Sequence, residues 1–307
     1  MNRPRKRYGD VLVEEWEGEE PFFDTDFAKK RTSGAGQVGV AQPRRILNST
    51  GGDRVHSGPS SSDVVLAAYE NGIMISGLRG SASLSLLAWF GFLPALGLVA
   101  SSVFAISVLL KGGWDFLVQE PGVAIGVAFV ALFPALFGIS GFSVLFRILV
   151  LMPSDFPVIF NRKAKDVWVT VPSMPSFIRI FEFHPVRFER HSWESLQPRT
   201  YRILEVTAGM SSARWTYILT MAFGREDDPT KVASEVNIGF KGWGDDFELL
   251  QLWEHIRQYM NDAGPALDQG EKFKTFSTGR LPKFPDEAMA ALGRKLSESE
   301  AWAAPKT

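Results

Sequence analysis

The sequence predicts an α+β protein in which a transmembrane helical hairpin is inserted into a β-rich domain. Three observations support this fold class. Two long uncharged apolar runs lie in the middle of the chain, β-rich segments flank them on both sides, and one amphipathic pattern follows the last β-rich segment. Uncharged apolar runs of more than ~18 residues are typical of membrane-spanning helices.

Residues 1–62 are predicted to form a disordered N-terminal tail. A basic tip is followed by an acidic patch with interleaved aromatic residues, and then by Gly/Ser/Thr-rich chain. Such polar composition buries too little apolar surface to offset the entropy of ordering. The whole chain has a net charge of −1 and no cysteine. Nucleic acid is therefore not an expected partner, and thiol chemistry, Cys-ligated zinc and disulfides are excluded.

Residues 63–80 are predicted to form a β-hairpin. Two β-rich runs, 64–69 and 73–76, flank Asn71-Gly72. This dipeptide favours a type I′ turn because both of its residues tolerate positive φ. A two-stranded hairpin alone is marginal in water, so we expect it to join strands that follow the apolar runs.

Residues 81–152 are predicted to be the transmembrane hairpin, with spans at about 83–110 and 121–147. A proline lies inside each run, and glycines of the second run are spaced for close approach of another helix. Buried helices tolerate proline where neighbours satisfy the freed carbonyl, and small residues let helix backbones approach. Six residues are expected to shape helix packing, against the other span or a second copy of the chain: Pro94, Pro134, Gly122, Gly126, Gly138 and Gly141.

The charges beside the two runs predict an orientation. The link between the runs holds only Lys111 as a cation, against Asp115 and Glu120, whereas several Lys and Arg residues lie outside the runs. Cytoplasmic flanks carry the excess of positive charge. The chain is therefore expected to be a multi-pass membrane protein with both termini cytoplasmic.

Residues 153–264 are predicted to form the main cytoplasmic β-rich domain. Two strands flank a turn at 161–165, and an amphipathic helix begins near Asp245 or Asp246. The remaining β-rich runs are 177–183, 200–206, 214–223 and 231–240. Phe247, Leu250 and Trp253 begin the helical spacing that closes the domain. We expect a meander of five or six strands closed by this helix. Residues 265–307 then form a linker and one short helix, from Asp286 to about Trp302.

The turn after the first of these strands is the candidate binding site. Asn161, Arg162, Lys163 and Lys165 follow the second apolar run closely. Near an anionic membrane surface each such cation contributes about 1 kcal/mol, so lipid headgroups are one candidate ligand and a protein partner is another. The competing interpretation is that these residues set the topology and solvate an ordinary turn.

Catalytic and metal-binding signatures are missing from the sequence. His184 and His191 flank charged residues including Glu189, but no HExxH or comparable ligand spacing is present. We therefore predict no catalytic residue, no metal and no cofactor. A membrane enzyme centred on the two histidines stays as an alternative, as does an oligomeric pore.

Two short motifs carry a resemblance to a known family. Phe160-Asn161-Arg162-Lys163 and Val167-Trp168-Val169 follow the two apolar runs. In this respect the chain resembles an uncharacterised group of bacterial two-transmembrane-helix proteins, many of them encoded near type VI secretion genes. The resemblance implies a role around effector delivery or protection. The order of strands followed by a helix is also similar to that of pleckstrin-homology-like domains.

The function expected from the sequence is a non-enzymatic inner-membrane protein whose cytoplasmic domain binds a protein partner. The resemblance implies a type VI secretion adaptor or an immunity-type protein, with an effector, a toxin or a secretion component as the partner. Membrane lipids and a second copy of the chain are further expected partners. An anionic-lipid-binding module and a membrane enzyme are the alternatives.

Overall fold

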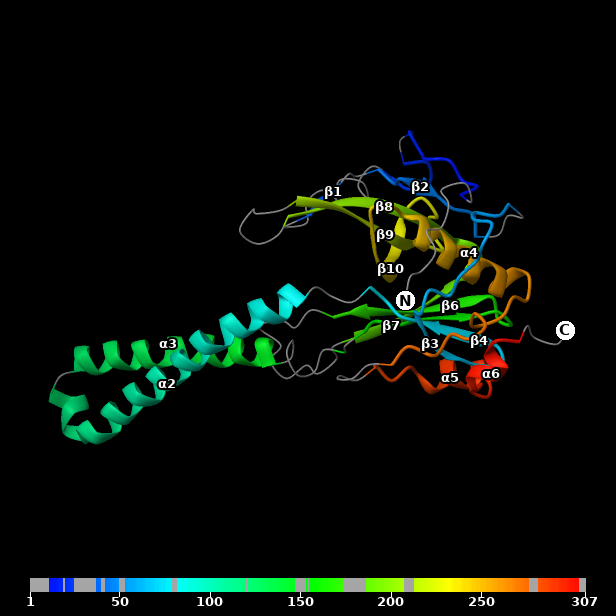
Figure 1. The fold of residues 1–307 in the computed structure, drawn as a ribbon. Coiled ribbons are helices and arrows are strands. Elements are labelled where there is room, and N and C mark those ends of the chain that lie inside the picture. The colour runs from blue at the N-terminus through cyan, green and yellow to red at the C-terminus, as the bar shows by residue number, and fades with distance from the viewer. Residues whose placement is uncertain are drawn as a thin grey trace. The chain divides into compact units, whose positions relative to one another are not determined.

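The computed structural model divides the chain into two compact units (Figure 1). The first contains Met1–Arg79, Ser154–Val171 and Phe188–Thr307, and the second contains Gly80–Pro153 and Pro172–Arg187. The structure describes residues 11–18, 20–24, 37–39, 42–49, 53–78, 82–119, 121–146, 153, 155–173, 186–206, 213–275 and 281–303. The strand predicted at 177–183 lies outside these residues.

One five-stranded sheet has the order β3-β4-β5-β6-β7. The bounds of its strands are β3 (Val65–Ala68), β4 (Gly72–Ile75), β5 (Val158–Asn161), β6 (Asp166–Pro172) and β7 (Val186–Ser192). Strands β4 and β5 are antiparallel neighbours, with Ile75 opposite Val158. The β3–β4 hairpin therefore pairs with a strand that follows residues 76–157 in the sequence.

The second five-stranded sheet has the order β1-β8-β9-β10, and β2 also pairs with β8. The bounds of its strands are β1 (Gln37–Gly39), β2 (Arg45–Ile46), β8 (Leu196–Val206), β9 (Ala213–Gly224) and β10 (Val232–Trp243). A 3-10 turn, η3 (Trp193–Ser195), leads from β7 into β8. The predicted single meander is thus two sheets, because alternation in a sequence indicates the faces of a strand but not its neighbours.

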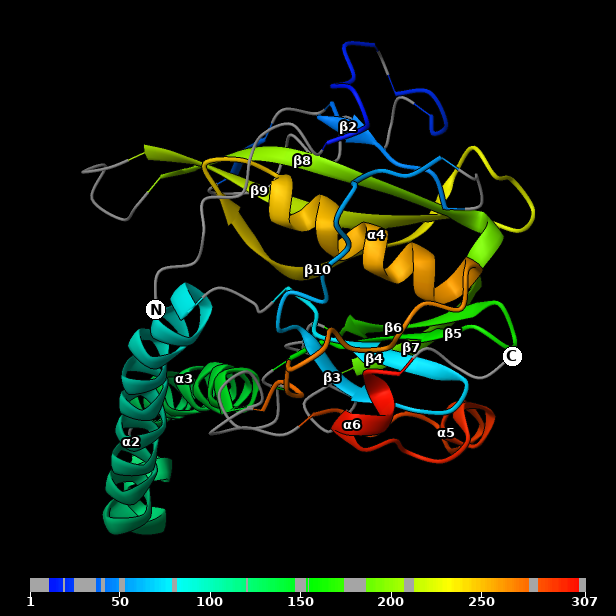
Figure 2. The same cartoon turned by 45° about the vertical axis from the view of Figure 1, so that its right-hand side comes forward.

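Helix α4 (Phe247–Asn261) lies between the two sheets, as Figure 2 shows. Its apolar residues share one core with inward-facing residues of both sheets, including Phe160 of β5 and Leu219 of β9. The helix begins after Asp246, which makes no side-chain capping bond. Its carboxylate instead accepts hydrogen bonds from Arg45 Nε, at 3.2 Å, and Thr200 Oγ1, at 2.8 Å. Asp246 therefore links α4 to β2 and β8.

The sheet of β3 to β7 is covered on both faces. Ile73 and Ile75 pack in the core that contains α4, whereas Met74 between them packs on the opposite side. That side is covered by α5 (Asp286–Leu292), through Ala288 and Leu292. Successive strand residues point to opposite faces, so a strand buried on both faces is apolar throughout.

The two sheets are joined at a corner beyond the end of β4. Leu78 N donates to Asn237 O of β10 at 2.9 Å, and Gly239 N donates to Ser76 O at 2.8 Å. The buried carboxylate of Asp155 accepts from Gly77 N at 2.8 Å and from the hydroxyl of Ser76. These bonds connect the end of β4 to the segment that enters β5.

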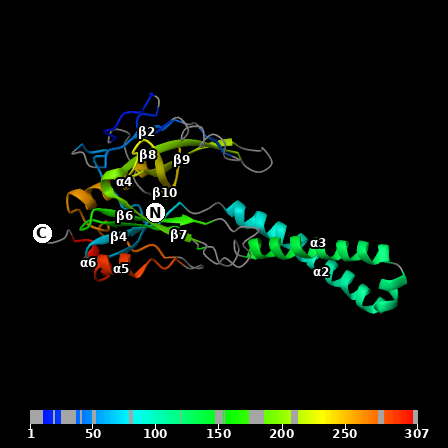
Figure 3. The same ribbon diagram turned by 180° about the vertical axis from the view of Figure 1, so that it is seen from behind.

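The second unit contains two antiparallel helices that lie side by side, α2 (Ala82–Gln119) and α3 (Pro121–Phe146) (Figure 3). Helix α2 continues through Lys111, so the predicted link between the apolar runs is largely helical. Phe92 and Phe142 contact each other across the pair, with 5.0 Å between ring centroids.

The structure corrects the membrane prediction. A helix needs about 20 consecutive apolar residues to cross a bilayer. Among the residues that the structure describes, no helix combines the length and the apolar character needed for such a crossing. This finding contradicts the transmembrane hairpin at 81–152, its two spans and the multi-pass inner-membrane location. The fold class that remains is α+β with sheets.

Two further segments differ from expectation. The short helix predicted from Asp286 to Trp302 is two helices, α5 and α6 (Glu298–Ala301), because Gly293 adopts a φ of +76° between them. Part of the predicted disordered tail packs on the sheets, where Leu47 and Val55 are buried. Both residues join the core that contains α4, a long-range contact that local composition does not reveal.

Candidate functional site

The predicted site begins at the turn between β5 and β6. Asn161 is buried, and its Oδ1 accepts hydrogen bonds from the backbone N–H groups of Lys163 and Ala164, both at 3.1 Å. Asn side chains stabilise turns in this way. Lys165 completes the turn with a φ of +53°. Asn161 therefore shapes the turn from inside rather than facing a ligand.

The three cations of this turn point to different surroundings. The guanidinium of Arg162 lies 5.1 Å from the ring centroid of Tyr259 on α4 and donates to the backbone carbonyl of Glu70. Lys165 donates to the carbonyl of Met260, whereas Lys163 is exposed. The structure thus does not bring Arg162, Lys163 and Lys165 together as one binding patch.

Arg162 lines a cavity of about 560 Å³ near the C-terminal end of α4. The cavity combines two arginines, two glutamates, two tyrosines and a wall of small apolar residues. Its lining residues are Tyr69, Glu70, Arg162, Tyr259, Ala266, Arg294, Leu296, Glu300, Ala301 and Ala303. Only Arg162 among them belongs to the predicted site, because the others come from the β3–β4 turn, α4 and the C-terminal segment.

The other cation of this cavity, Arg294, is paired with acids. It donates to Glu300 at 2.9 and 3.3 Å and to Glu70 at 3.3 Å. The hydrogen bond from Arg294 and those from Ser297 lower the pKa of Glu300 to about 2. Glu300 and Glu70 therefore face a cation that already neutralises part of their charge.

Tyr259 lines the cavity and carries a buried hydroxyl. Its side chain is 1% exposed, and its hydroxyl has no hydrogen-bond partner among the described residues. Burial raises the pKa of Tyr259, and the positive charge of Arg162 opposes this. Burial likewise raises the pKa of Tyr69. Both phenols are therefore neutral hydrogen-bond donors at physiological pH.

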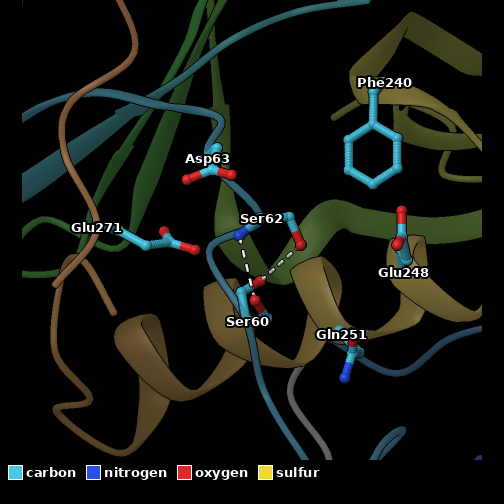
Figure 4. Close-up of a pocket in the computed structure, with 7 residues that line it drawn as sticks. All are labelled: Ser60, Ser62, Asp63, Phe240, Glu248, Gln251 and Glu271. Carbon is cyan, nitrogen blue, oxygen red and sulfur yellow. Dashed lines mark hydrogen bonds between the residues drawn. The ribbon is translucent and has the colours of Figure 1, made fainter. Parts of the chain in front are cut away.

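A second cavity, of about 430 Å³, has an acidic lining (Figure 4). Asp63 and Glu271 lie on one side of it, and Glu248 of α4 and Phe240 of β10 lie on another. Burial raises the pKa of Glu271, although the hydroxyl of Ser61 donates to its carboxylate. Within the described residues, no group of three or more His, Asp or Glu side chains is arranged to hold a metal ion.

Sequence reasoning missed two tryptophan–arginine pairs at one end of the sheet of β8 to β10. Trp243 is 67% exposed with Arg214 3.6 Å from its ring centroid, and Trp215 is 39% exposed with Arg202 at 4.0 Å. The alternation of β9 groups Trp215 with the buried Tyr217. The length of β9 could have indicated the exposed end. The strand has 12 residues, and only its later part packs in the core.

The register places these two tryptophans on opposite faces. Trp243 lies opposite Thr216 in the β9–β10 pair, and Trp215 precedes Thr216 in β9. Directly opposed residues share a face, whereas consecutive residues alternate. The end of this sheet therefore presents an arginine-stacked tryptophan on each side.

Of the two histidines in the enzyme alternative, the structure describes His191, and His184 lies outside the described residues. The ring of His191 stacks on Phe223, with 4.4 Å between centroids, and its Nε2 lies 3.4 Å from a carboxylate oxygen of Glu189. Burial lowers the pKa of His191, and the nearby carboxylate of Glu189 opposes this. His191 is thus a packed, mainly neutral side chain.

The predicted packing residues of α2 and α3 differ in their surroundings. A Cβ on Gly138 would lie 2.9 Å from Val99, and one on Gly141 would lie 3.7 Å from Ala95 Cβ. For Gly122 and Gly126 no described atom lies within 4 Å of such a Cβ. Pro94 and Pro134 lie inside helices that continue past them.

The comparisons with known proteins add one finding. No curated protein and no solved structure matches this chain. Residues 136–286 match the model of a family that is described as a family of unknown function (DUF6708), which is consistent with an uncharacterised family.

Proposed function

We propose that this chain is a non-enzymatic module that binds a protein partner through the tryptophan–arginine end of the β8–β9–β10 sheet. The observation that carries the proposal is the exposure of Trp243 and Trp215, each stacked by an arginine. Tryptophan and arginine are enriched among the residues that dominate protein–protein affinity. A large exposed indole also has unfavourable contact with water, which a partner would remove.

The two faces define how the partner would bind. Trp215, near the start of β9, and Trp243, at the end of β10, lie on opposite faces of the same end of the sheet. A partner that covers both must therefore enclose this end. Arg202 and Arg214 are exposed and lie over the indole rings, so they keep each ring in a fixed orientation. A pre-ordered side chain loses less conformational entropy on binding than a mobile one.

The resemblance of the Phe160-Asn161-Arg162-Lys163 turn to a family encoded near type VI secretion genes supports a choice of partner class. We propose an effector, a toxin or another secretion component. An immunity role requires that co-expression of the chain protects cells from the partner. An adaptor role requires instead that loss of the chain prevents delivery of the partner.

The anionic-lipid alternative has less support. Its three cations are separated, because Arg162 and Lys165 both contact carbonyl groups of this chain.

The test is capture of a partner by the full-length chain, followed by affinity measurement with the purified partner. Trp243→Ser and Trp215→Ser should each weaken binding by at least about thirtyfold, as expected for residues that contribute about 2 kcal/mol or more. Trp16→Ser is the matched control, because Trp16 is 41% exposed and lies in the N-terminal segment. Its backbone N–H donates to the Arg44 carbonyl, and the substitution keeps this bond. Unchanged affinity in the Trp215/Trp243 double variant would refute this docking surface.

A further inference from the structure

We propose that the cavity beside Arg162 binds a carboxylate attached to a small apolar body. The carboxylate would belong either to a small organic acid or to the free C-terminus of a peptide. This site is distinct from the tryptophan–arginine end of the sheet and does not depend on the proposed function.

Arg162 carries a positive charge that no carboxylate of the described residues neutralises. Its guanidinium donates to the carbonyl of Glu70 and contacts the face of Tyr259, and it has no carboxylate partner among the described residues. Arg294, which lines the same cavity, has Glu70 and Glu300 as ion-pair partners. Arg162 thus has N–H donors left for a ligand, and the planar fork of a guanidinium matches a carboxylate.

The ring of Tyr259 holds the guanidinium of Arg162 at the cavity. Tyr259 lines the cavity, and the guanidinium lies 5.1 Å from the centroid of its ring. Arg162 also donates to the carbonyl of Glu70, so two contacts restrict its side chain. A side chain that is already ordered loses less conformational entropy when a carboxylate binds.

The remaining wall of the cavity is apolar, and it determines which part of a ligand can lie beside the carboxylate. Ala266, Leu296, Ala301 and Ala303 supply small apolar surface, and Leu296 also packs against the main core. A cavity of about 560 Å³ lies within the range of about 300–1,000 Å³ that is usual for small-molecule sites. The fit is to a short aliphatic acid or to the last few small residues of a peptide.

Calorimetric titration of the purified full-length chain tests the proposal with two pairs of probes. Hexanoate is compared with hexanamide, and N-acetyl-trialanine with a free carboxylate is compared with its C-terminal amide. We expect at least one acid to bind saturably and its amide to bind at least about tenfold more weakly, which corresponds to 1.4 kcal/mol. The acid that binds more tightly identifies the source of the carboxylate.

Variants then assign the binding to this cavity. Arg162→Gln should weaken binding of the acid at least about tenfold, and Arg162→Lys, which keeps the charge but loses the fork, should weaken it less. Lys163→Gln is the matched control, because Lys163 is exposed on the same turn and does not line the cavity. Tyr259→Phe keeps the ring beneath Arg162 and should leave the affinity for the acid within about twofold.

Two results would overturn the proposal. One is the absence of saturable binding by both acids to a chain whose circular dichroism shows a folded state. The other is equal affinity for an acid in the wild type and in Arg162→Gln, or in Arg162→Lys if Arg162→Gln does not fold.

Discussion

Glu254 is a buried carboxylate on α4 whose hydrogen bonds connect this helix to the N-terminal segment. Its oxygens accept from Arg257 at 2.8 and 3.1 Å, from Gln258 at 2.8 Å and from the backbone N–H of Val55 at 3.0 Å. Glu254 is 0% exposed and Arg257 is 3% exposed. A buried ion pair of this kind is costly to break, because removing one partner leaves the other charge uncompensated.

We therefore predict that Glu254→Gln lowers the free energy of unfolding by about 3 kcal/mol. The glutamine keeps the size of the side chain but leaves the guanidinium of Arg257 without its main counter-charge. Urea-induced unfolding, followed by circular dichroism, measures the change. Glu194→Gln serves as the control, since Glu194 is exposed in η3, and its change should be below about 0.5 kcal/mol.

The same carboxylate predicts a pH dependence. Burial alone would raise the pKa of Glu254, but the hydrogen bonds from Arg257, Val55 and Gln258 outweigh it and hold the pKa below 4.5. A lowered folded-state pKa contributes stability above the unfolded value and loses it as the pH falls through the folded value. The stability difference between wild type and Glu254→Gln should therefore be full at pH 7 and shrink below pH 4.5. A difference that is constant down to pH 3 would contradict this.

At the scale of elements, Gly293 decides how the C-terminal segment covers the sheet of β3 to β7. Its φ of +76° ends α5, and a Cβ there would lie 2.8 Å from Glu70 Oε2. Gly293→Ala should thus cost about 1–3 kcal/mol in unfolding free energy. Gly270→Ala is the control, because Gly270 also has a positive φ, +84°, but open space around it. An equal loss in both variants would mean that backbone strain alone, and not the contact with Glu70, is responsible.

Helices α2 and α3 allow a direct test of their packing. A Cβ on Gly141 would lie 3.7 Å from Ala95 Cβ, within the Cβ–Cβ range of about 3.5–4.5 Å for disulfides. The natural chain has no cysteine, so a double variant introduces one defined pair. Ala95→Cys with Gly141→Cys should form a disulfide under mild oxidation, as thiol titration would show. Ala95→Cys with Gly126→Cys should not, because no described atom lies within 4 Å of a Cβ on Gly126.

The elements themselves were largely predictable, and their partners were not. β-rich runs located β9 and β10, helical spacing located α4, and the Asn71-Gly72 pair located the β3–β4 turn. The prediction of one C-terminal helix missed two signals, namely Gly293 as a break and the capping box of Ser297 with Glu300 at the start of α6. The pairing of β1 and β2 with β8 depends on contacts between distant parts of the chain, which local pattern does not encode.

The candidate sites show the same division. The turn at 161–165 was found because Asn, Arg and Lys cluster there in the sequence. The cavity beside Arg162 was missed because its other residues come from the β3–β4 turn, α4 and the C-terminal helices. The exposure of Trp215 was missed because Trp215 lies two residues from the buried Tyr217, on the same face of β9. Burial depends on where the neighbouring elements end, and a strand pattern does not contain that information.

At the scale of the whole molecule, the first unit is built from three stretches of chain that close around one core. The β3–β4 hairpin and β5 pair directly although the long segment of α2 and α3 lies between them in the sequence. The backbone of Gly77 lies against the carbonyl of Phe156, so the chain leaves and re-enters the sheet at neighbouring points. The N-terminal segment also joins, since Glu20 pairs with the buried Arg199.

This topology predicts that the intervening helices are dispensable for the sheets. Replacing residues 80–153 by a short Gly/Ser linker should leave a chain that unfolds cooperatively, with its unfolding free energy changed by less than about 2 kcal/mol. The ends to be joined are already adjacent, and shortening a loop changes its closure entropy by only about 0.6 kcal/mol per halving. Circular dichroism and urea unfolding measure the outcome. Val158→Asp in the shortened chain, which places a charge at the fully buried first residue of β5, should abolish the transition. Loss of cooperative unfolding without that substitution would show that the sheets require α2 and α3.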